Sequence, residues 1–117
     1  MDYDLPDVIR VEVDGPVRIV RLSRPENLNA INEGLHLGLT RLFPQLSADT
    51  DARVALITGE GRAFSAGGDF DLLDRMAKDV QLRRDVIAEG RELVLNMIRC
   101  RVPVVAAVNG ASWSPAL

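Results

Sequence analysis

The sequence predicts an α/β protein in which two parallel strands end beside each other. Two almost wholly apolar runs, RVALIT at residues 53–58 and VVAAV at residues 104–108, are typical of parallel strands that are covered on both faces. Between them, residues 70–101 carry apolar side chains at the spacings of three and four that indicate helix. Parallel strands need such a crossover, so the loops that follow the two strands should lie side by side. Open α/β sheets bind their ligands at these carboxyl ends.

Size and composition narrow the possible classes of protein. The 117 residues form one domain or a piece of one, and a hydrophobic content of 47% is enough for a core. A net charge of −3 with scattered basic residues gives no reason to expect nucleic acid or a membrane surface as a partner. The single cysteine, Cys100, cannot form an internal disulfide, which fits a reducing compartment. We see no signal-peptide pattern and no apolar run near the roughly 20 residues that span a bilayer, so we predict a soluble cytoplasmic protein.

The chain begins with a predicted β-hairpin. In VIRVEV, residues 8–13, apolar and charged side chains alternate as in a half-buried strand. Asp14-Gly15-Pro16 has the composition of a turn. The strand pattern resumes in VRIVRL, residues 17–22, so we expect the two runs to pair.

A polar loop over residues 23–30 leads to a predicted helix, which Asn32 is suited to cap and Glu33 to start. One apolar face at helical spacing is formed by Leu35, Leu39, Leu42, Phe43 and Leu46. Pro44 cannot donate to the carbonyl of Thr40, and its ring crowds that carbonyl. We therefore expect a kink or an early end there, followed by a loop over residues 47–52.

The glycine-rich stretch GEGRAFSAGGDF, residues 59–70, follows the first buried strand and precedes a helix. Gly67 and Gly68 have no side chain to block a ligand, so the peptide N–H groups of the loop can approach one closely. Asp69 suits the N-cap of the next helix, whose first turn presents unpaired N–H donors. Loop and helix start together could hold an oxygen that becomes negative during a reaction. The alternative is a tight turn that simply requires glycine.

After this loop we predict a short helix near residues 70–76 and a long helix over about residues 81–100, joined by a poorly defined bridge. Charges on the long helix form a solvated face to which we assign no site: Arg83, Arg84, Asp85, Glu89 and Arg91. Pro103 ends this helix. The second buried strand then leads into the turn pair Asn109-Gly110, which opens a second loop.

Three separated motifs carry a resemblance to a known family. RPENLNAIN, then RVALITGEGRAFSAGGDFDLL, then CRVPVVAAVNG are similar, in this order, to the front half of the crotonase superfamily, the enoyl-CoA hydratases and isomerases. The similarity covers about residues 8–110. It implies a crotonase-like fold, a ββα superhelix, that is incomplete at the C-terminus. Residues 1–117 would then be the N-terminal part of a single acyl-CoA-binding domain.

The resemblance implies hydration or double-bond isomerisation of an enoyl-CoA, with coenzyme A as part of the substrate and no separate cofactor. In this family two peptide N–H groups bind the thioester oxygen and stabilise its enolate-like charge. The first donor corresponds to the N–H of Gly68, which follows Ala66 and Gly67. The backbone of residues Ala66, Gly67, Gly68 and Asp69 would line the path of the pantetheine and adenine. Leu28 and Ala30 match the loop that meets the adenine end.

The end of the chain departs from the family pattern. Where the family continues from Asn-Gly to a run of glycines, this chain reads NGASWSPAL, and Pro115 falls at the position of the second N–H donor. Proline has no N–H to donate. Trp113 and Ser114 also replace smaller residues, so we interpret about residues 111–117 as an off-pattern tail. It could be an altered reading frame, a natural truncation or an engineered end.

The chain stops at Leu117, before the glutamates that the family uses as general acid and base. Glu60, Glu89 and Glu92 do not match those positions and receive no catalytic role. We therefore expect the chain alone to be inactive, whereas full-length relatives often form trimers and pairs of trimers. The alternative function is a non-catalytic fragment that binds coenzyme A weakly or pairs with another subunit through exposed apolar surface.

Two other chemistries have little support in the sequence. A serine hydrolase would need Ser65 as nucleophile, but His36 is the only histidine and no G-x-S-x-G turn is present. With no partner visible nearby, we interpret His36 as a surface or packing residue rather than a catalytic base. A metal site is not expected, because one histidine and one cysteine offer no ligand spacing.

Overall fold

The computed structural model describes residues 1–112 and confirms the α/β class. Nine of the ten elements below are strands or α-helices, and the tenth is a short 3-10 helix, η1. In chain order they are β1 (Ile9–Asp14), β2 (Val17–Leu22), η1 (Pro25–Asn27), α1 (Glu33–Ala48), β3 (Val54–Gly59), β4 (Ala63–Ser65), α2 (Phe70–Lys78), α3 (Val80–Ile98), β5 (Val104–Ala106) and β6 (Ala111–Ser112).

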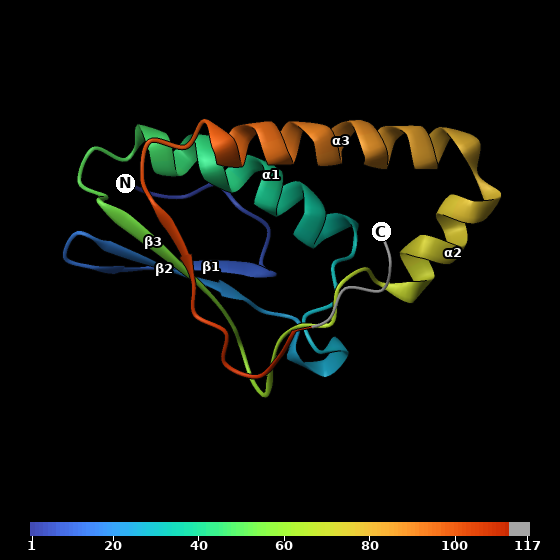
Figure 1. Cartoon of the computed structure of the whole chain (residues 1–117), viewed down its shortest axis with the longest axis horizontal. Coiled ribbons are helices and arrows are strands. Elements are labelled where there is room, and N and C mark those ends of the chain that lie inside the picture. Colours follow the sequence, from blue (N-terminus) through green and yellow to red (C-terminus); the bar gives the residue numbers. More distant parts are fainter. Residues whose placement is uncertain (113–117) are drawn as a thin grey trace.

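The main sheet has the strand order β1-β2-β3-β5. β1 and β2 pair antiparallel, which confirms the predicted hairpin, and Gly15 turns the chain between them with a φ of 58°. β2 with β3 and β3 with β5 pair in parallel. α2 and α3 supply the crossover between β3 and β5, as the apolar spacing predicted. The carboxyl ends of β3 and β5 therefore point to the same edge of the sheet (Figure 1).

The helices α1 and α3 lie side by side over one face of this sheet (Figure 1). The prediction that the parallel strands are covered on both faces is wrong for the described residues, because Val105 of β5 is 47% exposed. The buried face of α1 is nevertheless the predicted one. Leu35, Leu42, Phe43 and Leu46 are all buried against Val20, Leu22 and Ala55 of the sheet, and Leu39 is partly buried. Each fully buried side chain of this size contributes about 1.5–3 kcal/mol.

Of the kink or early end predicted at Pro44, the early end is wrong, because the helix continues to Ala48 and the loop begins only after it. Pro44 leaves the carbonyl of Thr40 without its usual helical donor. The side chain of Asn96, on α3, donates a hydrogen bond of 2.9 Å from Nδ2 to that carbonyl. A residue 56 positions later in the chain therefore supplies the donor that proline lacks. At the other end of α1, Asn32 caps the helix as predicted, its side chain accepting from the N–H of Leu35.

The two predicted helices after the glycine loop are both present. Asp69 caps α2 as predicted, and its carboxylate accepts a 3.1 Å hydrogen bond from the N–H of Leu72. The predicted bridge between α2 and α3 is reduced to Asp79, whose carboxylate caps α3 through the N–H of Leu82. An acceptor at each helix start explains why two helices fit into a segment with a single residue between them.

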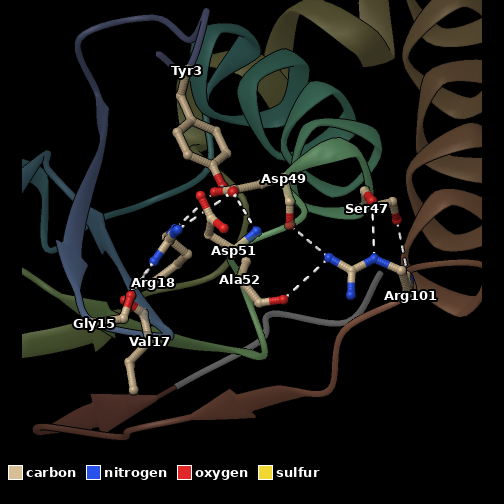
Figure 2. Close-up of polar contacts among 9 residues, drawn as sticks. All are labelled: Tyr3, Gly15, Val17, Arg18, Ser47, Asp49, Asp51, Ala52 and Arg101. Atoms are coloured by element: carbon tan, nitrogen blue, oxygen red, sulfur yellow. Dashed lines mark hydrogen bonds and ion pairs between the residues drawn. The ribbon is translucent and has the colours of Figure 1, made fainter. Parts of the chain in front are cut away.

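A buried ion pair links β2 to the end of α1 (Figure 2). Arg18 donates from Nε to Oδ2 of Asp49 at 2.7 Å, and both side chains are almost wholly buried. The hydroxyl of Tyr3 donates to the same carboxylate oxygen at 2.6 Å. Arg18 also donates from Nη1 to the carbonyl of Gly15 in the hairpin turn. One carboxylate therefore joins the N-terminal segment, the hairpin and α1.

Arg101 extends this network toward β5 (Figure 2). Its guanidinium donates to the carbonyls of Ser47, Asp49 and Ala52 at 3.1, 2.6 and 3.1 Å. The backbone N–H of Arg101 donates to Oγ of Ser47. Arg101, which precedes β5, is thereby hydrogen-bonded to the segment that precedes β3. The starts of the two parallel strands are fixed together, and so is the position of their carboxyl ends.

The buried network predicts a stability maximum between acid and alkaline limits. Hydrogen bonds from Arg18 and Tyr3 hold the pKa of Asp49 well below its ordinary value. Unfolding therefore becomes easier as the pH falls below about 4, because the unfolded state takes up the proton first. Burial, with help from Asp49, raises the pKa of Tyr3 to about 12. Stability should fall again above about pH 10, where the unfolded state loses the phenol proton first.

Urea unfolding between pH 2 and 11 measures this profile. Asp49→Asn should flatten the acid limb and lower the free energy of unfolding by about 3–5 kcal/mol, because it leaves Arg18 buried without a counterion. Glu12→Gln is the control, since Glu12 forms only an exposed 3.4 Å pair with Arg21. An acid limb of equal steepness in Asp49→Asn and in the unchanged chain would contradict the assignment.

Candidate functional site

Three loops meet beyond the carboxyl ends of β3 and β5 (Figure 1). The loop after β3 contains β4, and the loop after β5 contains β6, and these two short strands pair in parallel. The prediction that the two loops lie side by side is therefore confirmed. β4 itself was not predicted, because its three residues lie within a stretch interpreted as a glycine loop. The third loop, from the NLNAIN segment, joins them through a parallel bridge between Ile31 and Gly68.

Asn109 fastens the second loop to the first. Its Oδ1 accepts from the N–H of Gly59 at 3.0 Å, and its Nδ2 donates to the carbonyl of Gly61 at 2.9 Å. Gly110 follows at a point of close approach, where a Cβ would overlap the carbonyl oxygen of Arg62. The Asn-Gly pair predicted as a turn therefore also packs against the glycine-rich loop.

The bridge to Ile31 decides the direction of the Gly68 amide. The N–H of Ile31 donates to the carbonyl of Gly67 at 2.7 Å, and the N–H of Asp69 donates to the carbonyl of Ile31 at 3.0 Å. The bonds use the residues on either side of Gly68, so its own N–H points away from Ile31. Within residues 1–112 no protein atom accepts a hydrogen bond from this N–H. A donor of this kind can serve a ligand.

A cavity of about 410 Å³ contains five of the six predicted site residues. It is lined by Leu28, Ala30, Ala66, Gly68 and Asp69, together with Glu26, Asn27, Arg62, Phe70 and Asp71. Gly67 is not among these lining residues. The structure thus brings the NLNA loop and the SAGGD loop to one hollow, although the role of each residue stays a prediction.

A smaller cavity of about 110 Å³ is also lined by Gly68. Apart from His36 its walls are apolar or glycine: Ile31, Gly68, Leu72, Leu73, Met76 and Val86. Gly68 is the residue that the two cavities share. Gly68 therefore borders both a hollow with polar walls and a mostly apolar one.

Gly67 has the conformational role that the alternative of a tight turn predicted. Its φ of 84° lies in the left-handed region, which disfavours residues with a Cβ. Its N–H donates to Oγ of Ser65 at 3.1 Å, so it is occupied within the protein. Asp69, besides capping α2, lies 3.5 Å from Nη1 of Arg24. These contacts fix the loop on both sides of Gly68.

Ser65 is placed for structure and not for nucleophilic attack. Its buried hydroxyl donates to the carbonyl of Asn29 at 2.9 Å and accepts from the N–H of Gly67. His36 instead pairs through Nδ1 with Oε1 of Glu89, between α1 and α3, which gives it the predicted packing role. The described residues contain no Ser65–His36 hydrogen bond, so the hydrolase alternative has no geometric support.

Glu89 was assigned to a solvated face with no site, and its pair with His36 on α1 corrects that assignment. Glu60 has a partner as well, because its Oε2 accepts from the hydroxyl of Ser23. The predictions for Trp113, Ser114 and Pro115 lie outside the described residues. Among residues 1–112 no cluster of three or more metal-ligating side chains occurs. In the same range, no helix combines the length and apolar character needed to cross a membrane.

Arg62 is a site candidate that the sequence reasoning missed. Of the described residues that line the larger cavity, it alone carries a positive charge. The glycines of GEGRAFSAGG indicated backbone N–H donors, and the arginine among them was assigned no role. The available signal was its place inside a loop predicted to meet a phosphate-bearing ligand, for which arginine is a common partner.

The fold and this loop arrangement define an α/β protein of the crotonase type. A crystal structure of an enoyl-CoA hydratase/isomerase from Mycobacterium paratuberculosis matches at a TM-score of 0.88 and 56% identity, over 92% of this chain and 43% of that one. The family description enoyl-CoA hydratase/isomerase matches residues 12–115. The chain belongs to the enoyl-CoA hydratase/isomerase family, as the three motifs predicted.

Relatives with different reactions resemble the chain to similar degrees. A probable enoyl-CoA hydratase of Rhodobacter capsulatus is 36% identical, over 89% of this chain and 39% of its own length. The mitochondrial Delta(3,5)-Delta(2,4)-dienoyl-CoA isomerase of Rattus norvegicus is 32% identical, over 78% of this chain and 31% of its own length. The chain thus spans less than half the length of these relatives.

Gly67→Ala tests the left-handed turn before Gly68. We expect the free energy of unfolding to fall by about 1–2 kcal/mol, because a Cβ is disfavoured at this φ. Gly34→Ala is the matched control, because its Cβ would lie at ordinary contact distances of 3.7 and 3.8 Å inside α1. That change should stabilise by up to about 1 kcal/mol. Chemical denaturation measures both, and equal effects of one sign would contradict the assignment.

Proposed function

We propose that this chain binds the acyl thioester of a coenzyme A substrate, with the thioester oxygen on the N–H of Gly68. The observation that carries the proposal is that this amide points away from Ile31 and has no acceptor among residues 1–112, while Gly68 lines both cavities. The reaction class is hydration or double-bond isomerisation of an enoyl-CoA. Membership of the enoyl-CoA hydratase/isomerase family supports this class.

The two cavities suit the two ends of such a substrate. The larger one runs past Leu28 and Ala30 and would take the coenzyme A portion, with Arg62 available to a phosphate. The smaller one, walled by Leu72, Met76 and other apolar groups, would take the start of the acyl chain. The thioester carbonyl would then fall beside Gly68, at the junction.

In this pose the Gly68 amide would act as an oxyanion donor. Proton transfer at the carbon next to the carbonyl moves negative charge onto the thioester oxygen, and a fixed N–H stabilises that charge more than the neutral carbonyl. The donor is held before substrate arrives, so little reorganisation is needed. Loss of one such donor typically slows the reaction on the order of a hundredfold to a thousandfold.

We propose that these residues bind the thioester without turning it over. The resemblance assigns no general acid or base to the matched motifs. Glu60 and Glu89 are occupied by Ser23 and His36. Assembly into trimers and residence in the cytoplasm remain predictions, and relatives named as mitochondrial or peroxisomal show that the compartment varies.

Exposed apolar surface on α3 favours a second candidate, a subunit-interaction role. In the described structure no residue of α3 is buried, although the helix spans 19 residues. Val80, Ile87 and Val94 repeat every seven residues and are 52%, 61% and 47% exposed. Ile98 and Met97 extend this apolar stripe toward β5. Such a stripe is typical of a surface that another helix or subunit covers.

The binding proposal is tested with crotonyl-CoA labelled with ¹³C at the thioester carbonyl. We expect the carbon signal to move on binding, because the Gly68 N–H polarises the carbonyl. Chemical synthesis with an ester oxygen in place of that N–H should abolish the movement and weaken binding roughly three- to tenfold. Gly68→Ala is the control, because it keeps the N–H and its Cβ would meet only the flexible Leu73 side chain, at 3.3 Å.

Turnover of crotonyl-CoA is measured beside the titration. Turnover near that of a full-length relative would contradict binding without catalysis. An unchanged carbonyl signal with saturable binding would show that the thioester lies elsewhere.

The interaction alternative is tested by sedimentation velocity over a range of concentrations. We expect the apparent mass to rise with concentration, because association removes the α3 stripe from water. Ile87→Glu and Val94→Glu should each shift the curve toward the monomer. Glu92→Lys should leave it unchanged, because this exposed residue is five positions from Ile87 and two from Val94 and so lies on a different face of the helix. A monomer at all concentrations would exclude this surface as a self-association site.

A further inference from the structure

The loop before α1 contains a buried polar side chain that the proposed function does not use. Asn29 is fully buried, at 0% exposure, and its φ of 54° lies in the left-handed region. Asparagine tolerates this conformation better than most residues with a Cβ. A buried amide is costly unless its donors and acceptor all have partners.

The Asn29 side chain has a partner for each of its polar atoms. Oδ1 accepts from the N–H of Arg24 at 2.7 Å. Nδ2 donates to the carbonyls of Glu60 and Ala63 at 3.0 and 2.9 Å. One side chain therefore fastens its own loop to the turn between β3 and β4. Ala63 also accepts from Asn109 at 3.4 Å, so all three motif segments meet at one carbonyl oxygen.

A second path runs from the Asn29 backbone toward the oxyanion donor. Its carbonyl accepts from Oγ of Ser65 at 2.9 Å, and the same Oγ accepts from the N–H of Gly67 at 3.1 Å. Two residues after Asn29, the N–H of Ile31 donates to the carbonyl of Gly67. Both backbone polar groups of Gly67 are therefore held by the Asn29 segment, one of them through Ser65.

The hydrogen bonds of Gly67 also determine the direction of the Gly68 N–H, because the two residues share a peptide bond. The carbonyl of Gly67 and the N–H of Gly68 belong to one planar trans peptide, in which they point in opposite directions. Fixing the carbonyl on Ile31 therefore turns the Gly68 N–H away from Ile31, and Gly68 itself lines both cavities. The torsions that could rotate this peptide are ψ of Gly67 and φ of Gly68, and the bonds of Gly67 to Ser65 and Ile31 hold the residue on one side of both.

We propose that Asn29 and Ser65 are positioning residues that hold the Gly68 amide in the direction of a bound thioester oxygen. Neither touches the substrate in the proposed pose. The inference rests on the proposed function for the identity of the ligand, but the orientation of the Gly68 N–H does not depend on a bound ligand. Loss of the Ser65 hydroxyl would free the N–H of Gly67. Loss of the Asn29 donor would remove the side-chain bond to the carbonyl of Glu60 and leave that of Ala63 with only the 3.4 Å bond from Asn109.

The test uses the ¹⁵N-labelled full chain with Ser65→Ala, Ser65→Thr and Asn29→Asp. Asn29→Asp keeps the acceptor for Arg24 but removes the donor, and Ser65→Thr keeps the hydroxyl. The matched control is Asn96→Ala, which removes an equivalent side-chain-to-carbonyl bond far along the chain, on Thr40. Hydrogen exchange at Gly67, the amide shift of Gly68 and the carbonyl shift of bound ¹³C-crotonyl-CoA are measured, with unfolding curves beside them.

In Ser65→Ala we expect exchange at Gly67 to accelerate roughly three- to tenfold, the gain that one lost hydrogen bond predicts. The Gly68 signal should move, and the carbonyl polarisation of bound thioester should fall. Ser65→Thr should restore all three, and Asn96→Ala should lower stability without changing them. Asn29→Asp should shift the Gly68 signal in the direction of Ser65→Ala.

Unchanged Gly67 and Gly68 signals in Ser65→Ala would overturn the inference, as would equal changes in Asn96→Ala. If Asn29→Asp does not fold, Ser65→Ala decides alone. Failure of the unchanged chain to bind the thioester would overturn the proposed function. Exchange at Gly67 and the amide shift of Gly68 would still test whether Asn29 and Ser65 position the Gly68 N–H.

Discussion

The contacts of Arg101 are the constraint on which the site geometry depends. Its guanidinium holds the carbonyls that lead into β3, while its own backbone leads into β5. Asp49, one of the residues it holds, is itself fixed by Arg18 and Tyr3. Parallel strands that start from a common anchor also end together, so the two loops beyond them meet at a defined place. The buried Arg18–Asp49 pair and the exposed Arg101 at one edge of the sheet thus set the site at the opposite edge.

At that opposite edge, backbone groups and not charges define the chemistry. The glycine loop is joined to its neighbours through the carbonyls of Glu60, Gly61 and Ala63, which accept from two asparagine side chains. With these carbonyls occupied and Gly67 held by Ser65 and Ile31, the Gly68 amide is left as a donor with no acceptor among residues 1–112. A site of this kind needs no titrating side chain, and its precision comes from neutral hydrogen bonds in a buried setting.

Local patterns in the sequence predicted most elements because they are themselves local. Alternation predicted the hairpin, and Asn32 and Asp69 cap helices as expected, each through a bond three residues away. The errors at Pro44 and Glu89 have a different origin. Their partners, Asn96 and His36, lie more than 50 residues distant in the chain, and no periodic pattern signals such pairs.

The candidate site likewise combines features that local motifs predict with contacts that they do not. The motifs predicted which loop residues come together, and five of the six predicted residues line one cavity. They did not indicate what aims the amide, because that depends on the hydroxyl of Ser65, which the sequence suggested only as a rejected nucleophile. Arg62 and the strand β4 were overlooked for a related reason: the glycines around them indicated backbone N–H donors, whereas β4 depends on pairing with β6, which is distant in the chain.

The donor that Asn96 supplies to Thr40 has a consequence for how the chain is made. Until α3 has been synthesised and has docked, the interior of α1 lacks one of its bonds at the proline. The hydrogen bonding of α1 is therefore complete only after α3 has been synthesised and has packed against it. A proline that would break an isolated helix instead makes two distant segments mature together.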